Sequence, residues 1–145
     1  MNEILFFGLN KYPKFLKNEQ DKITKPIQFK FENENEKQIK QISTGNYSTI
    51  FLFENGKAIE YLKNSKLNPS KIQIENIQKV TVGYQNEAIL TIEGNFINIS
   101  SLIEDTNDRI IQDVISGYSS IYLLTSNQNV YGIGSNNYGQ LGFRF

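Results

Sequence analysis

Carboxylates are the side chains of this sequence that could perform acid–base chemistry, because the chain contains neither histidine nor cysteine. That composition excludes Ser-His and Cys-His nucleophile pairs, disulfides and thiolate metal sites. Glu104, Asp105, Asp108 and Asp113 could supply a catalytic carboxylate pair, but such pairs act only when held close together across a substrate. Asp105 and Asp108 lie in the polar stretch D-T-N-D-R, which favours a solvated connection. We therefore expect no catalytic residues and no enzyme activity.

Two further stretches could hold a ligand. The run E-N-E-N-E-K at 32–37 could bind a metal ion, but it lacks the glycine-centred spacing of a calcium loop and favours a solvated loop. The glycines of 132–142 follow an expected strand, yet neither a helix nor a Lys-Ser/Thr pair follows them, as a phosphate-binding loop requires. We therefore expect no bound metal and no cofactor.

Charge and hydropathy bear on the partners and the compartment. The chain has 15 basic and 15 acidic residues, so we expect no nucleic-acid partner and no attraction to an anionic membrane. No apolar run has the length needed to cross a bilayer. The short run Ile4–Leu9 follows Glu3 instead of a basic segment, which argues against a signal peptide. We expect an intracellular protein, cytoplasmic in preference to nuclear.

An internal repeat organises the chain. Aligned on Gly45, Gly83 and Gly117, which are 38 and 34 residues apart, three units share their apolar positions. Each unit carries an isoleucine before the glycine, a β-branched residue nearer to it and a leucine after it: Ile39, Ile77 and Ile111; Ile42, Val80 and Val114; Leu52, Leu90 and Leu124. Turn residues come next at Gly56, Gly94 and Gln128. Each unit therefore reads as three antiparallel strands joined by short turns.

The strands follow from alternation of apolar and polar residues, and no stretch shows a convincing helical period. The expected second and third strands are Ser48–Phe53 and Lys57–Tyr61, Glu87–Ile92 and Asn95–Ile99, and Ser120–Thr125 and Val130–Ile133. A further strand is expected at Pro26–Phe31. Three strands alone are marginally stable, and repeated units bury their apolar faces against one another. We expect an all-β chain of β-propeller blades; a sandwich explains the strand number but leaves the repeat unexplained.

The ends of the chain share a second pattern. The stretch Asn129–Gly142, N-V-Y-G-I-G-S-N-N-Y-G-Q-L-G, resembles the signature of the regulator-of-chromosome-condensation repeat, and Asp113–Ser126 resembles its other half. Ile4–Tyr12 keeps the Gly-x-Asn-x-Tyr spacing of the last unit. The full Gly-Gln-Leu-Gly ending occurs only in the last unit, since Pro13, Lys14, Phe15 and Leu16 stand at those places in the first.

The resemblance implies propeller blades, in a family whose propellers have seven. About three repeats are present, so residues 1–145 are expected to form an incomplete or fragmentary ring. We expect a partial first unit at approximately 1–38, followed by units at approximately 39–76, 77–110 and 111–145. The uncovered apolar faces of such a stack predict self-association.

The function that the resemblance implies is a scaffold for protein–protein interactions, with another protein as the partner. The alternative is a regulatory guanine-nucleotide exchange factor for a small Ran-type GTPase. The chain shows neither the protruding wedge nor the basic tail that the alternative would require. The sequence assigns no partner-binding residues.

Local roles follow from residue type. We expect Gly45, Gly83 and Gly117 to be turn positions selected for their backbone angles. Tyr47, Tyr84 and Tyr118, which could form a recognition patch, are expected to pack against neighbouring blades. Asn136 and Gln140 are expected to satisfy backbone groups of their own loop. The three aligned leucines are expected to be buried, with Ile42, Val80 and Val114 packing nearby.

Overall fold

The computed structural model describes residues 4–9, 22–29, 31, 38–62, 70–98, 103–105 and 110–142. These residues form thirteen strands in four antiparallel sheets, and no helix occurs among them. The described part of the chain accordingly holds no helix long and apolar enough to span a membrane. The all-β expectation is confirmed.

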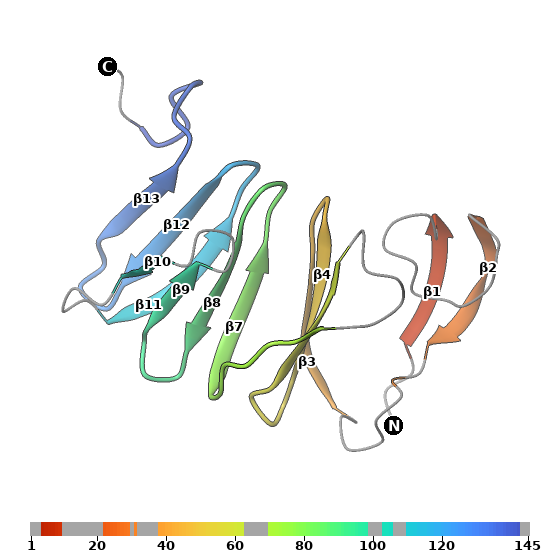
Figure 1. Ribbon diagram of the computed structural model, residues 1–145. Coiled ribbons are helices and arrows are strands. Elements are labelled where there is room, and N and C mark those ends of the chain that lie inside the picture. The colour runs from red at the N-terminus through yellow and green to blue at the C-terminus, as the bar shows by residue number, and fades with distance from the viewer. Residues whose placement is uncertain are drawn as a thin grey trace.

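Each sheet is built from strands that follow one another in the chain (Figure 1). The first sheet contains β1 (Ile4–Leu9) and β2 (Lys22–Phe29). The second contains β3 (Ile39–Thr44), β4 (Ser48–Phe53), β5 (Ala58–Leu62) and β6 (Ser70–Lys71). The third contains β7 (Ile77–Val82), β8 (Glu87–Thr91), β9 (Phe96–Asn98) and β10 (Ile103–Asp105). The fourth contains β11 (Ile111–Ser116), β12 (Ser120–Thr125) and β13 (Val130–Gly134). The second, third and fourth sheets stand side by side in chain order.

The three larger sheets repeat the same local geometry. Their second turns place Gly56, Gly94 and Gln128 in the left-handed region, with φ of 74°, 82° and 63°. In each turn this residue's N–H donates to the carbonyl of the residue three positions earlier, at 3.0, 3.0 and 2.9 Å. The first strand of each sheet also shifts register directly after its leading isoleucine. The repeat in the sequence therefore corresponds to a repeat in the structure.

The pattern shared by the two ends of the chain has the same backbone. Gly8 in β1 has φ of 112°, and Gly134 in β13 has φ of 114°. The strand expected at Pro26–Phe31 begins four residues earlier, because β2 pairs with β1 from Lys22 onward. Asn10, Tyr12 and 13–16 lie outside the described residues.

The core lies between sheets. Between the second and third sheets, Ile50, Leu52 and Ala58 pack with a cluster that includes Val80 and Ile89. Between the third and fourth sheets, the equivalent side chains Ala88, Leu90 and Phe96 pack against Ile111, Val114, Ile121 and Leu123. Burial of apolar surface between sheets stabilises a fold of this kind, because each sheet alone would expose one apolar face.

An aromatic cluster covers the other face of the second sheet. Phe29 of β2 stacks on Phe51, with ring centroids 6.0 Å apart, and meets the edge of Tyr61 at 5.9 Å. Phe31 lies edge-on to Phe53 at 5.1 Å. The first sheet is thus joined to the second by rings that pack edge-to-face and offset, the geometries that aromatic quadrupoles favour.

The expected core is confirmed at four of six positions. Leu52, Leu90, Val80 and Val114 are each at most 1% exposed. The expectation for Ile42 is wrong, since it is 49% exposed. Val80 and Val114 each pack against the sheet that precedes their own. The sheet that precedes Ile42 has only two strands among the described residues, β1 and β2.

The sixth position, Leu124, is half-buried because it faces away from the third sheet. Its equivalents Leu52 and Leu90 lie on the same face of their sheets, and there the next sheet covers them. Val130 on the same face is 66% exposed, although its equivalents Ala58 and Phe96 are 2% and 1% exposed. Self-association through this face stays a prediction.

Substitution of Leu90 by alanine tests the packing between sheets. The variant should lower the free energy of unfolding by about 2–5 kcal/mol, because the truncated side chain leaves a cavity among Val114, Ile121 and Leu123. Chemical denaturation followed by circular dichroism measures the loss. The matched control is Ile92→Ala in the turn directly after the same strand, where the side chain is 67% exposed and a change within about 0.5 kcal/mol is expected. Equal losses in both variants would contradict the assigned core.

Candidate functional site

In the second, third and fourth sheets, the loops that join the first and second strands meet at one end of the stack. Gly45, Gly83 and Gly117 begin these loops, and their N–H groups donate to the carbonyls of Ser48, Asn86 and Ser120 at 2.9, 2.7 and 2.7 Å. A Cβ atom on Gly45 would lie 2.0 Å from the Gly83 carbonyl oxygen, and one on Gly83 would lie 2.1 Å from that of Gly117. The three glycines therefore occupy equivalent places in consecutive sheets.

Glycine is required at two of these positions for a different reason from the one expected. None of the three has a positive φ, so their backbone angles are open to other residues. Glycine is required at Gly45 and Gly83 because the backbone of the next sheet fills the space of a side chain. The expectation of a turn-angle role was wrong, and close approach between sheets replaces it.

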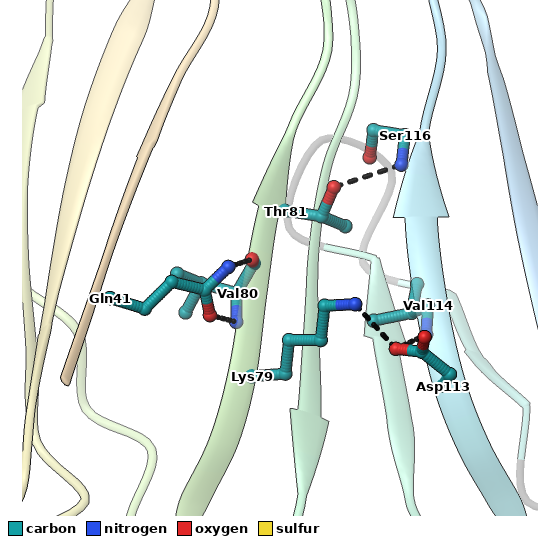
Figure 2. Close-up of polar contacts among 7 residues, drawn as sticks. All are labelled: Gln41, Lys79, Val80, Thr81, Asp113, Val114 and Ser116. Carbon is teal, nitrogen blue, oxygen red and sulfur yellow. Dashed lines mark hydrogen bonds and ion pairs between the residues drawn. The ribbon is translucent and has the colours of Figure 1, made fainter.

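Side chains of β3, β7 and β11, the first strands of the three larger sheets, hold neighbouring sheets in a fixed offset (Figure 2). The Gln41 amide binds the backbone of Val80 twice, donating from Nε2 to its carbonyl at 2.8 Å and accepting its N–H on Oε1 at 3.1 Å. One sheet further on, Thr81 Oγ1 accepts the Ser116 N–H at 2.8 Å. These contacts satisfy backbone groups that no neighbouring strand reaches, and they fix which loops lie next to one another.

Three tyrosines follow the stacked glycines, and we call Tyr47, Tyr84 and Tyr118 the tyrosine row. The rings of Tyr84 and Tyr118 are stacked, with centroids 4.1 Å apart and planes 10° apart. Tyr47 meets Tyr84 edge-on at 5.8 Å. Tyr118 nevertheless remains 67% exposed and Tyr47 44% exposed. The expected packing between sheets is confirmed, and the row also presents aromatic surface to solvent.

The loop 135–142 after β13 is held by its own polar groups. Asn136 Oδ1 accepts the Leu141 N–H at 2.8 Å, and Gln140 Oε1 accepts the Tyr138 N–H at 2.9 Å. Tyr122 in β12 donates its hydroxyl to the Gln140 carbonyl at 2.6 Å, which ties the loop to the sheet. The roles expected for Asn136 and Gln140 are confirmed. This fixed loop carries Tyr138 with 96% of its surface exposed.

A groove of about 950 Å³ lies between the tyrosine row and this loop, and we call it the loop groove. Its aromatic walls are Tyr118, Tyr122 and Tyr138. Its amide side chains are Gln85, Asn137 and Gln140, and the rest of its lining is serine and glycine. None of the described residues that line it is charged. The volume is that of a ligand site, and aromatic walls with a few amides are typical of one.

Comparisons with known proteins bear on the architecture. The sequence matches no protein-family model and has no significant match among curated proteins. The structure is similar to that of human WBSCR16, with a TM-score of 0.77 and 14% identity over 97% of this chain and 45% of that one. Prp20p from Saccharomyces cerevisiae has a TM-score of 0.72 and 13% identity over 96% of this chain and 41% of Prp20p. A second structure describes Prp20 as yeast RCC1.

The chain has the fold of regulator-of-chromosome-condensation repeats. Its sheets are therefore propeller blades, as the sequence predicts. The ectodomain of the Arabidopsis thaliana receptor kinase ACR4 is also similar, with a TM-score of 0.56 and 12% identity over 81% of this chain and 45% of that one. The chain spans less than half the length of each of these three proteins.

The carboxylates considered for catalysis occupy different places in the blades. Asp113 forms an ion pair with Lys79 of the preceding blade at 2.5 Å (Figure 2). Burial tends to raise the pKa of Asp113, but hydrogen bonds from Lys79 and from the Val114 N–H lower it below its ordinary value. Glu104 and Asp105 lie in β10, paired with Ile97 and Phe96. Asp108 and the run 32–37 are outside the described residues.

A pair of carboxyl groups at the interface of two blades, one buried and one half-buried, was not expected from the sequence. Glu60 of β5 is 7% exposed and hydrogen-bonds with Glu87 of β8. Ser70 Oγ donates to Glu60 Oε2 at 3.3 Å, and Ser48 Oγ donates to Glu87 Oε1. Burial raises the pKa of Glu60, and the hydrogen bond and charge of the neighbouring Glu87 carboxyl add to this effect; with the opposing effect of Ser70 included, the pKa is about 7. The protonated, neutral form of Glu60 is therefore favoured at this interface below about pH 7.

The pair predicts a dependence of stability on pH. In the folded chain Glu60 keeps its proton up to about pH 7, whereas in the unfolded chain it loses the proton near its ordinary pKa of 4.5. The free energy of unfolding should therefore fall as the pH rises from 4.5 to 7, by about 3 kcal/mol in total. Urea denaturation at pH 5 and pH 8 measures this difference.

The variant Glu60→Gln separates this effect from the titration of other groups. Its amide cannot ionise and can still donate to Glu87, so the variant should lose much less stability between pH 5 and pH 8 than the parent. Glu54→Gln at an exposed turn position is the control and should behave like the parent. If all three proteins lose equal stability over this range, the raised pKa of Glu60 is excluded.

Proposed function

We propose that the chain is a protein-interaction module whose binding surface is the tyrosine row together with the loop groove. The observation that carries this proposal is Tyr138, which is 96% exposed on a loop held by side-chain hydrogen bonds. An exposed aromatic ring on a rigid loop contributes little to folding, because it buries little surface. Tyrosine is enriched at the energetic centres of interfaces, since its ring gives a large contact area at low entropic cost.

The blades provide a rigid scaffold for the proposed binding surface. Recognition residues commonly lie on loops that a rigid scaffold positions. Here the glycine contacts and the Gln41 and Thr81 hydrogen bonds fix three such loops relative to one another. We propose that the chain acts by binding and not as an enzyme, which agrees with Asp113 and Glu60 being engaged in contacts between blades.

Site-specific photocrosslinking tests the proposed surface. The photoreactive amino acid p-benzoylphenylalanine replaces Tyr138 in one variant and Phe7 in another, since Phe7 is also well exposed, at 68%, but lies on β1. Position 138 should give discrete protein adducts that position 7 lacks. The partner identified from an adduct should then bind the purified parent chain and Phe7→Ala, but bind Tyr138→Ala at least about tenfold more weakly. Identical adduct patterns at the two positions would refute the proposed surface.

The second candidate is guanine-nucleotide exchange on a small GTPase. The similarity to Prp20p favours it, because that protein's structure was described with its binding properties to Gsp1p and histones. The chain matches only 41% of Prp20p, so the proposal for the interaction module stands first. Release of a fluorescent guanine nucleotide from a panel of Ran-type and other small GTPases distinguishes the two. We expect no acceleration by this chain; acceleration at catalytic amounts would establish the second candidate.

A further inference from the structure

Resting on the proposed function, we propose that the tyrosine row and the loop groove bind an uncharged, proline-rich segment of the partner in the polyproline II conformation. Three features of the surface support this choice: its lack of charge, its exposed aromatic rings and the hydrogen-bonding character of its amides. Each of them restricts the chemistry of the occupant in a different way.

The lack of charge excludes a charged segment. The three loops at 45–48, 83–86 and 117–120 contain no charged residue, and neither do the residues of the loop groove that the structure describes. The chain as a whole is not poor in charge, since it carries 15 basic and 15 acidic residues. A charged ligand group entering this surface would lose hydration without gaining a counter-charge, which is unfavourable. The occupant is therefore neutral where it contacts the surface.

The exposed rings match the flat apolar sides of proline. One face of Tyr118 is stacked on Tyr84, and Tyr118 is still 67% exposed beside the nearly fully exposed Tyr138. Proline-rich segments bind to aromatic-lined grooves in this way, and their preformed helix loses little entropy on binding. The loop that carries Tyr138 is also preformed, so little ordering is needed on either side.

The amide groups match the backbone of such a segment. A polyproline II helix makes no internal hydrogen bonds, and proline has no N–H, so its carbonyl oxygens require donors. Gln85 Oε1 accepts from Ser119 Oγ, and Gln140 Oε1 accepts from the Tyr138 N–H, at 2.9 Å in both cases. With these oxygens engaged, the amide NH₂ groups are the ends that remain to donate.

A carbohydrate is the competing occupant, since sugars also stack on tyrosine. Sugar hydroxyl groups donate hydrogen bonds as well as accept them, and carboxylates are strong acceptors for such donors. Within the described part of the chain, the lining of the loop groove contains no carboxylate. The donors of the groove therefore fit peptide carbonyls better than sugar hydroxyls.

Fluorescence anisotropy with defined probes tests the proposal. The probes are fluorescein-labelled decaproline, a Gly-Ser peptide of equal length, and a proline-rich peptide with interspersed Glu and Lys. Decaproline should bind the parent chain at least about tenfold more tightly than either of the other peptides. Maltohexaose and chitohexaose, added as competitors, should leave the anisotropy unchanged. Displacement by either sugar, or equal binding of the three peptides, would overturn the proposal.

Amino-acid substitutions test whether decaproline binds at this surface. Tyr138→Ala should weaken decaproline binding at least about tenfold, whereas Tyr138→Phe should retain it because the ring is kept. Phe7→Ala is the control and should bind like the parent. Both positions are exposed, so neither variant should lose stability, and thermal melts check this directly. Unchanged binding in Tyr138→Ala would refute the proposal. If the photocrosslinked partner binds through Tyr138 but decaproline does not, the chemistry of the partner is wrong and the proposed function stands.

Discussion

Backbone contact between neighbouring blades is the constraint on which the rest of the structure depends. At Gly45 and Gly83 the carbonyl of the next blade occupies the space of a side chain, so the blades approach as closely as their main chains permit. This approach brings the Tyr84 and Tyr118 rings into contact and lets the Gln85 N–H donate to the Tyr118 carbonyl at 3.1 Å. The tyrosine row is therefore a product of the packing of the blades as well as a feature of their loops.

Apolar and polar contacts have different roles in holding the blades. The clusters around Leu52 and Leu90 supply the burial that stabilises the stack, but apolar contact has no direction and would tolerate a shifted offset. The hydrogen bond that Gln41 donates to the Val80 carbonyl and the one that Thr81 accepts from the Ser116 N–H do have direction, and they select one offset. Glu60 and Glu87 add a contact whose contribution depends on the protonation of Glu60.

Much of the fold could be predicted from the sequence because each strand and turn repeats at a fixed place. The left-handed turns at Gly56, Gly94 and Gln128 and the buried leucines Leu52 and Leu90 follow from that alignment. The short strands β6 and β10 could not be found in the same way, because two or three residues are too few to show alternation. Ile42 was misjudged since its exposure depends on the neighbouring sheet and not on its own strand.

The candidate site was only partly visible in the sequence. The tyrosines could be recognised by their position beside the glycines, but their mutual stacking depends on the distance between blades. The hydrogen bonds of Asn136 and Gln140 follow from local turn chemistry and were foreseen. Glu60 and Glu87 are 27 positions apart in different units, so nothing in either local pattern brings them together.

The contacts that β3, β7 and β11 make with the neighbouring blade also differ from one blade to the next. Gln41, Lys79 and Asp113 stand at the same place in three repeats, yet the first binds the backbone of Val80 and the other two form an ion pair with each other. Identical blades could exchange places or pair with a blade of another chain, a common failure of repeat proteins during folding. The Gln41 contact uses backbone groups that any blade offers, whereas the Lys79–Asp113 ion pair requires two specific side chains on neighbouring blades. A blade that replaced either member of this ion pair with another group would leave a charge unmatched, so this junction is the more selective of the two.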